Sequence, residues 1–180
     1  MELKQGKVPR SLISNTLGEM LNKQKDSELY NHDLYKEMAS YFKGEGLHKL
    51  ANYYYKRGEE EKHHHDWIIT RLRECNYPIE YVSKPRITQT WNDRFKPFEL
   101  TVLVELDTTR QINEIVTKAL EEHDYKIVYW LFDTLINEQH EEEFLSKTIM
   151  DIANQDTDWL TKEDTIEEFY KRVQKNMNRP

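Results

Sequence analysis

Apolar residues recur every three or four positions along four long stretches of the chain, which predicts four amphipathic helices. These predicted helices span residues 11–43, 47–75, 94–122 and 125–153. A shorter pattern of the same kind predicts a fifth helix over residues 162–175, after a turn and with an N-terminal cap at Thr161 and Asp164. Residues 1–10 are expected to form an irregular arm.

The segment 76–93 contains Pro78 and Pro85 and has no regular period, so we expect a connection rather than a helix. A helix of about 28 residues is ~40 Å long, and an extended chain covers that distance in roughly a dozen residues. The segment can therefore return along the second helix and make the second and third helices parallel. The prediction is an all-α, four-helix bundle with one long crossover between helices 2 and 3, plus a short fifth C-terminal helix, in a single domain over residues 1–180.

Polar side chains interrupt the apolar face of each long helix near its middle. The interruptions are Glu28 in the first helix, Glu61 with His64 in the second, Glu105 in the third, and Gln139 with Glu142 in the fourth. Carboxylates gathered at one level of a bundle would repel one another unless cations lay between them. Carboxylate and imidazole ligands together suit iron, so the pattern predicts an iron site. Tyr35, one heptad after Glu28, either packs in the core or supplies a hydrogen bond or an electron to that site.

Each interruption taken alone has a simpler interpretation. Glu59–Glu61 and Glu141–Glu143 are typical of solvated helix faces, and His63–His65 of a partly exposed surface on which helical geometry lets only His64 face the site. A structural bundle without metal is therefore the alternative, but it would have unbroken apolar faces. The repetition of the same interruption in four helices favours the metal site.

The composition limits the classes of partner. A net charge of −7 argues against nucleic acid and is compatible with an affinity for cations. No apolar run approaches the roughly 18 residues of a membrane span, so no membrane partner is expected. The N-terminal residues show no secretory signal, and Cys75 is the only cysteine, so we expect a cytoplasmic protein.

Several short motifs resemble the ferritins, specifically the bacterial non-haem type, over roughly residues 11–175. They are Ser-Glu-Leu-Tyr at 27–30, Gly-Leu-His-Lys-Leu-Ala-Asn-Tyr-Tyr at 46–54, Glu-Glu-Lys-His-His at 60–64, Pro-Arg-Ile at 85–87, Ile-Asn-Glu-Ile at 112–115 and Asn-Glu-Gln-His-Glu-Glu-Glu at 137–143. The resemblance implies an iron-storage ferroxidase. Such a protein binds two Fe(II) ions at a di-iron centre, oxidises them with O2 or H2O2, and deposits Fe(III) as a mineral inside a hollow shell of 24 chains.

The resemblance also implies roles for individual residues. The first iron would be bound by Glu28, Glu61 and His64, and the second by the bridging Glu61 and Glu105, with Gln139 and Glu142 nearby. Tyr35 matches a tyrosine that the family keeps beside the centre. A third iron site would involve Glu60, Glu138 and Glu141. A haem-binding bacterioferritin would have His in place of Glu142 and Met in place of Lys62, so no haem is expected.

A non-storage di-iron oxidase or peroxidase is the alternative function. A rubrerythrin-like peroxidase would normally bring a rubredoxin-type module with four cysteines, whereas Cys75 is the only cysteine here. A small-shell, DNA-protecting relative would bind its iron between subunits, whereas the predicted ligands here belong to one chain. These contrasts favour the storage ferritin.

Overall fold

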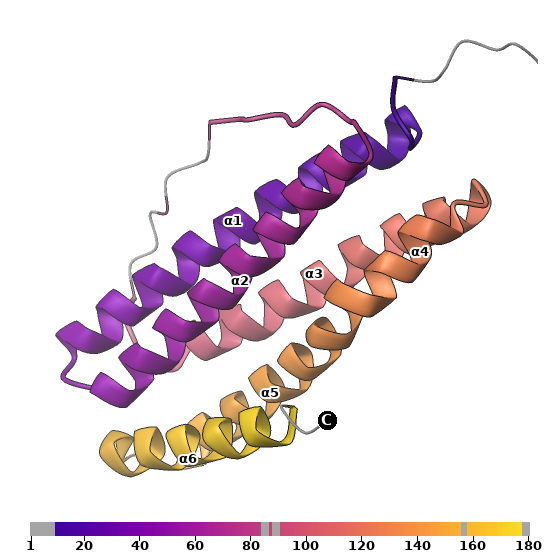
Figure 1. The fold of residues 1–180 in the computed structure, drawn as a ribbon. Helices are drawn as coiled ribbons and strands as arrows, with labels where there is room; N and C mark the ends of the chain where they lie inside the picture. Colours follow the sequence, from indigo (N-terminus) through magenta and orange to yellow (C-terminus); the bar gives the residue numbers. More distant parts are fainter. Residues whose placement is uncertain (1–9, 84–86, 88–90, 156–157, 178–180) are drawn as a thin grey trace, which may run out of the picture.

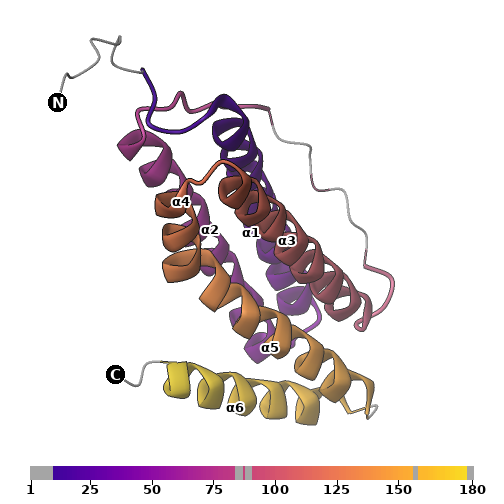
Figure 2. The same ribbon diagram turned by 90° about the vertical axis from the view of Figure 1, so that its right-hand side faces the viewer.

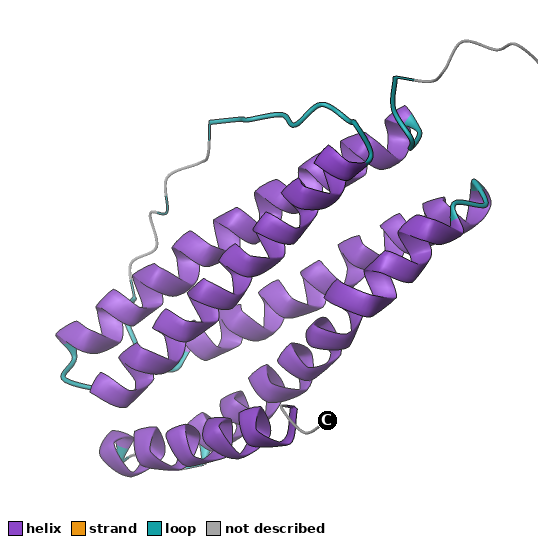
Figure 3. Ribbon diagram, viewed as in Figure 1, coloured by secondary structure: helices purple, strands orange, loops and turns teal. Residues whose placement is uncertain are grey.

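The computed structural model describes residues 10–83, 87, 91–155 and 158–177. Within these ranges the chain forms helices and no strand, which confirms the predicted all-α class (Figure 3). The helices are α1 Asn15–Gly44, α2 His48–Glu74, α3 Lys96–Glu121, α4 Tyr125–Leu131, the π-helical segment η1 Phe132–Ile136, α5 Asn137–Asn154 and α6 Trp159–Met177 (Figure 1). None of these described helices has the length and apolar character that a membrane crossing needs.

The long helices form a bundle of two antiparallel pairs. One pair is α1 with α2, and the other is α3 with the continuous rod of α4, η1 and α5 (Figure 1). Because α2 and α3 run in the same direction, the chain between them crosses from one end of the bundle to the other. This confirms the predicted four-helix bundle with one long crossover. The short helix α6 lies across one end of the bundle, against α2 and α5 (Figure 2).

Buried polar residues of α1 hold the start of the crossover. Asn22 donates from Nδ2 to the carbonyl of Pro78 at 2.9 Å and accepts from the backbone N–H of Glu80 at 2.9 Å. Lys25 donates from Nζ to the carbonyl of Glu80 at 2.6 Å. Asn22 and Lys25 therefore bind the backbone of the connection, and the polar residues in the middle of the bundle are different ones. Of the predicted N-terminal arm, all but Arg10 lies outside the described residues, as do residues 84–86 and 88–90 of the crossover.

Two helix starts differ from the prediction by more than two residues. Helix α1 begins at Asn15 rather than at residue 11, because Oγ of Ser14 caps it by accepting from the N–H of Leu17 at 3.1 Å. Helix α6 begins at Trp159 rather than at residue 162, because Asp158 accepts from the N–H of Leu160 at 3.1 Å. The predicted cap at Thr161 and Asp164 is therefore wrong.

The fourth predicted helix, residues 125–153, contains a π-helical segment that the sequence did not reveal. Its buried side chains recur every four residues at Ile127, Leu131, Leu135 and Gln139. A π turn holds more residues than an α turn, so the segment Phe132–Ile136 keeps these positions on one face. The segment thereby directs Gln139 into the core.

The bundle core consists of two apolar clusters with a polar layer between them. The cluster around the α1–α2 turn is rich in aromatic rings, including Phe42, Tyr54 and Phe98. The cluster at the other end is mostly aliphatic and includes Leu21 and Leu72. The polar interruptions predicted from the sequence lie between the clusters, where neither water nor apolar packing can satisfy them.

Candidate metal centre

The polar layer contains six of the predicted residues, which come from four helices and are each at most 5% exposed. They are Glu28 from α1, Glu61 and His64 from α2, Glu105 from α3, and Gln139 and Glu142 from α5. The structure therefore brings together the six residues that interrupt the predicted apolar faces.

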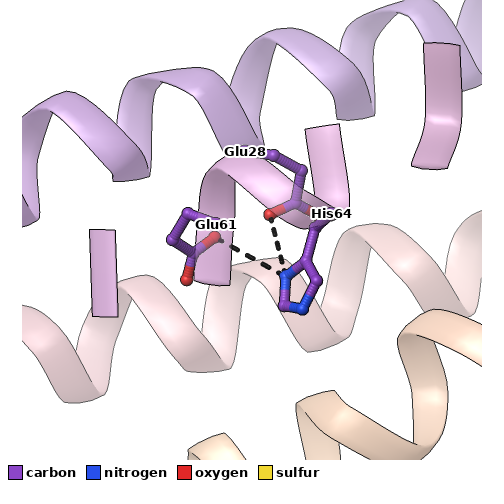
Figure 4. A group of neighbouring side chains, drawn as sticks. All are labelled: Glu28, Glu61 and His64. Carbon is purple, nitrogen blue, oxygen red and sulfur yellow. Dashed lines mark ion pairs between the residues drawn. The ribbon is translucent and has the colours of Figure 1, made fainter. Parts of the chain in front are cut away.

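The first group within this layer consists of Glu28, Glu61 and His64 (Figure 4). Nδ1 of His64 lies 3.9 Å from Oε2 of Glu28 and 4.0 Å from Oε2 of Glu61. One ion placed between such atoms would lie roughly 2 Å from each, an ordinary metal–ligand distance. Oε1 of Glu28 is occupied by a hydrogen bond from Gln24 at 2.8 Å, which leaves Oε2 directed at His64.

The second group consists of Glu61, Glu105 and Glu142, whose ligand atoms all lie within 4.8 Å of one another. Glu61 belongs to both groups, so its two carboxylate oxygens can bridge two ions. Gln139 donates from Nε2 to Oε2 of Glu105 at 2.8 Å. Gln139 therefore orients a carboxylate of the second group and adds no negative charge of its own.

Four carboxylate oxygens of the centre are buried without a hydrogen-bond partner. They are Oε2 of Glu28, both oxygens of Glu61 and Oε2 of Glu142. A buried acceptor left unsatisfied costs about 1–3 kcal/mol, and a charged one costs more. Cations bound in the two groups would satisfy all four, and carboxylates with one imidazole suit iron. The residues thus fit a di-iron centre.

A family model described as a ferritin-like domain matches residues 18–155, which include every residue of both groups. The chain belongs to the ferritin family. Its similarity to individual proteins confirms the bacterial non-haem type that the motifs predicted.

The sequence is 31% identical over 135 residues to the bacterial non-heme ferritin of Escherichia coli O6:H1, covering 74% of this chain and 80% of that ferritin. It is 29% identical over 140 residues to the bacterial non-heme ferritin of Campylobacter jejuni, covering 78% and 83%. The fold is similar to that of an open pore ferritin from the archaeon Archaeoglobus fulgidus, with a TM-score of 0.80 at 26% identity. That superposition covers 86% of this chain and 98% of the archaeal one.

Burial and neighbouring charges shift the protonation of this ferritin's centre. Burial first, then the nearby Glu105 and Glu28, raise the pKa of Glu61 well above its usual range. Burial raises the pKa of Glu142 to about 7. Burial alone would lower the pKa of His64, but Glu142 and a hydrogen bond to Glu138 outweigh it and raise the pKa to about 9. At neutral pH, a metal ion must therefore displace protons from the metal-free centre.

A carboxylate outside the two groups fixes the ring of His64. Nε2 of His64 lies 2.9 Å from Oε2 of Glu138 and donates to it, which turns Nδ1 toward Glu28 and Glu61. A ligand histidine is commonly oriented by such a carboxylate on its other nitrogen. Glu138, which was predicted at a third iron site, thus also contacts His64 of the first group.

Tyr35 performs a similar orienting function in the second group. Its hydroxyl donates to Oε1 of Glu105 at 2.5 Å. Burial first, then the charges of Glu105 and Glu61, raise the pKa of Tyr35 well above its usual value, so the hydroxyl keeps its proton. Core packing, a hydrogen bond to the site and the supply of an electron were considered for Tyr35, and the structure contains the hydrogen bond.

The residues predicted for a third iron, Glu60, Glu138 and Glu141, line one hollow of about 340 Å³ beside the centre. In the described part of the chain their oxygens do not form a third group with ligand spacing. Oε1 of Glu60 accepts from the hydroxyl of Tyr170 at 2.9 Å. The third iron site remains a prediction.

The sequence reasoning assigned no role to Arg57, which is 1% exposed and lies among the carboxylates of the second group. Its spacing of four residues from Glu61 places both on one face of α2, and that spacing was the available signal. Arg57 is therefore part of the candidate metal centre, because it pairs with two of the centre's carboxylates.

Metal binding by this centre should release protons and weaken as the pH falls. Below its pKa of about 9, His64 is protonated and unable to bind metal through Nδ1. We expect at least one proton to be released per centre when Co(II) binds to the group of His64 at pH 7, and an affinity that falls about tenfold per pH unit for each proton displaced. Co(II) titrations in buffers with different ionisation enthalpies measure this release. Binding at pH 7 without proton release would contradict it.

Proposed function

We propose that this ferritin is an iron-storage protein of the cytoplasm, which oxidises Fe(II) to Fe(III) at the di-iron centre and deposits Fe(III) as a mineral inside a shell of its own copies. The observation that carries the proposal is a pair of buried ligand groups that share Glu61 and leave four carboxylate oxygens unpartnered. Two Fe(II) ions and O2 or H2O2 are the substrates, and no haem is required.

The chemistry follows from the charge of the centre. Two Fe(II) ions supply two electrons, which O2 takes up together with two protons to give H2O2, or which H2O2 takes up with two protons to give water. Four carboxylates, from Glu28, Glu61, Glu105 and Glu142, stabilise the higher charge of Fe(III) and so favour oxidation. Glu61, which belongs to both ligand groups, would bridge the two ions, and two-metal sites typically hold their ions about 3.5–4 Å apart. Tyr35 and Glu138 orient the ligands Glu105 and His64.

Self-association is supported by the apolar surface of the chain. A hollow of about 410 Å³ between α1 and α3 is lined by Tyr30, Val82, Leu103 and Val104, among other residues. Leu103 is 63% exposed and Val82 is 56% exposed in the single chain. Apolar groups gathered in this way are typical of contact surfaces. A shell of 24 chains is the assembly that we propose.

Aerobic addition of Fe(II) to the metal-free protein tests the proposal. The iron that stays in solution is measured per chain on the size-separated assembly. We expect far more iron than the centre's ligands can bind, eluting with a large shell. About two irons per chain on a small oligomer would move the function to a non-storage di-iron oxidase or peroxidase. No retained iron would reject both functions.

Gln139 is expected to let iron leave the second site. The substitution Gln139→Glu replaces a neutral hydrogen-bond donor on Glu105 by another negative charge, which binds Fe(III) more tightly. We expect normal oxidation of the first two irons per chain and at least roughly tenfold slower oxidation of later additions, because iron stays trapped at the centre. Repeated Fe(II) additions measure how fast the oxidation rate recovers after the first two irons. Gln139→Met, which loses the hydrogen bond but adds no charge, is the control, and unchanged turnover in Gln139→Glu would rule the idea out.

A further inference from the structure

Arg57 is 1% exposed and lies inside the di-iron centre. Its guanidinium donates from Nη1 to Oε1 of Glu142 at 2.6 Å and from Nη2 to Oε1 of Glu105 at 2.7 Å. Nη2 also lies 3.7 Å from Oε1 of Glu61. One permanent positive charge therefore contacts every carboxylate of the second group.

The first group differs from the second in this respect. In the described part of the chain, no lysine or arginine forms an ion pair with Glu28, and Oε2 of Glu28 has no hydrogen-bond partner. In the described residues, no arginine or lysine is hydrogen-bonded to a member of the first group, whereas Glu105 and Glu142 of the second group each accept a hydrogen bond from the guanidinium of Arg57. An arginine side chain stays charged at any pH a protein tolerates, so the pairing persists until another cation replaces it.

We propose that the guanidinium of Arg57 competes with the second iron for Glu105 and Glu142, so that the two sites fill in a fixed order. The inference rests on the proposed ferroxidase function and assigns Arg57 as a positioning residue. The first metal ion binds to Glu28, His64 and Oε2 of Glu61 without displacing the guanidinium of Arg57. The second ion binds only when Arg57 leaves its two carboxylates, so the second site has the lower affinity.

The hollow beside the centre gives the guanidinium a place to move to. It is lined by Arg57 itself together with Glu60 and Glu141. Nη1 of Arg57 already donates to Oε2 of Glu60 at 2.8 Å, and Oε2 of Glu141 is buried without a hydrogen-bond partner. The hydroxyl of Tyr170 on α6 holds the other oxygen of Glu60. Rotation of the arginine side chain toward Glu60 and Glu141 keeps it paired while the second group becomes free for metal.

Calorimetric titration of the assembled, metal-free protein with Co(II) tests this order. For the unmodified chain we expect two ions per centre, with dissociation constants that differ at least about 100-fold. The variant Arg57→Met has a neutral side chain of similar length, and we expect the ratio to fall below about tenfold. Arg71→Met on the same helix is the matched control, because Arg71 pairs with Glu74 outside the centre, and it should keep the original ratio.

A second variant decides the question if Arg57→Met does not fold. Glu141→Gln removes the negative charge toward which Arg57 moves, so we expect a wider ratio of the two dissociation constants, by about threefold to tenfold. An unchanged ratio in this variant would overturn the inference, as would equal affinities in the unmodified chain. If the unmodified chain binds no Co(II) at the centre, the proposed function itself fails, so the two failures are distinguishable.

Discussion

Replacing Glu61 by glutamine is expected to slow Fe(II) oxidation more than about 100-fold, beyond the 10–100-fold typical for partners outside the ligand shell. Glu61 is the one residue common to both ligand groups, so its loss weakens both sites and removes their bridge. The substitution keeps the shape of the side chain and removes only its negative charge.

The same substitution is expected to raise the melting temperature of the metal-free protein, by ~5 °C. Both oxygens of Glu61 are buried without a hydrogen-bond partner, and burial with neighbouring carboxylates raises its pKa. A carboxyl group with a raised pKa destabilises the fold at pH values above its unfolded pKa, because the fold must then bury a charge or take up a proton. A glutamine amide at this position has no charge to bury and donates to the unpartnered oxygen of Glu28.

Stopped-flow oxidation of Fe(II) and thermal unfolding at a fixed chain concentration measure the two effects. Glu59→Gln is the matched control, since Glu59 is two residues earlier on α2, is 58% exposed and pairs with Lys36 at the surface. We expect the control to change neither quantity appreciably. A Glu61→Gln variant that oxidises iron at the normal rate would show that the bridge is not needed for the reaction.

The six residues of the polar layer could be predicted from the sequence because residues three or four positions apart lie on the same face of a helix. Glu28, Glu61, Glu105 and Glu142 each interrupt an apolar face near the middle of a helix. The long connection between helices 2 and 3 then fixed how the helices are arranged. Inward-facing residues near the middle of each helix then lie at one level of the bundle, so their proximity follows from the helix arrangement alone.

The remaining features depend on contacts between helices, which spacing does not specify. Whether Arg57 pairs with Glu142 on α5 or extends to solvent depends on side-chain packing across the bundle. The contact of Glu138 with His64 depends on the π-helical segment, which sets the rotation of α5. Propensity also does not separate Ser14 from Ser11 as a helix cap, because both residues have the same capping chemistry.

Phe42→Ala is expected to have the opposite effects to Glu61→Gln. It should lower the free energy of unfolding by about 3–5 kcal/mol and leave the centre's metal binding intact. Phe42 is fully buried, stacks on Tyr54 with ring centroids 5.4 Å apart and contacts Phe98 at 5.5 Å. The substitution opens a cavity where α1, α2 and α3 meet, and the surrounding rings are too rigid to fill it. For a chain of this size, such a loss lowers the melting temperature by roughly 10 °C.

Thermal unfolding of the metal-free protein and Co(II) titration of the folded protein measure both parts of this expectation. Phe42→Leu, which keeps most of the buried volume, should cost less than about 1.5 kcal/mol and serves as the control. Phe42 is not one of the ligand residues, and it stacks on Tyr54, whose ring lies 6.0 Å from that of Tyr35. Loss of Co(II) binding at an unchanged melting temperature would mean that the aromatic cluster acts on the centre rather than on the fold. A lower melting temperature with normal Co(II) binding in Phe42→Ala would show that the apolar clusters stabilise this bundle. A higher melting temperature with slower Fe(II) oxidation in Glu61→Gln would show that the polar layer binds metal at the cost of stability.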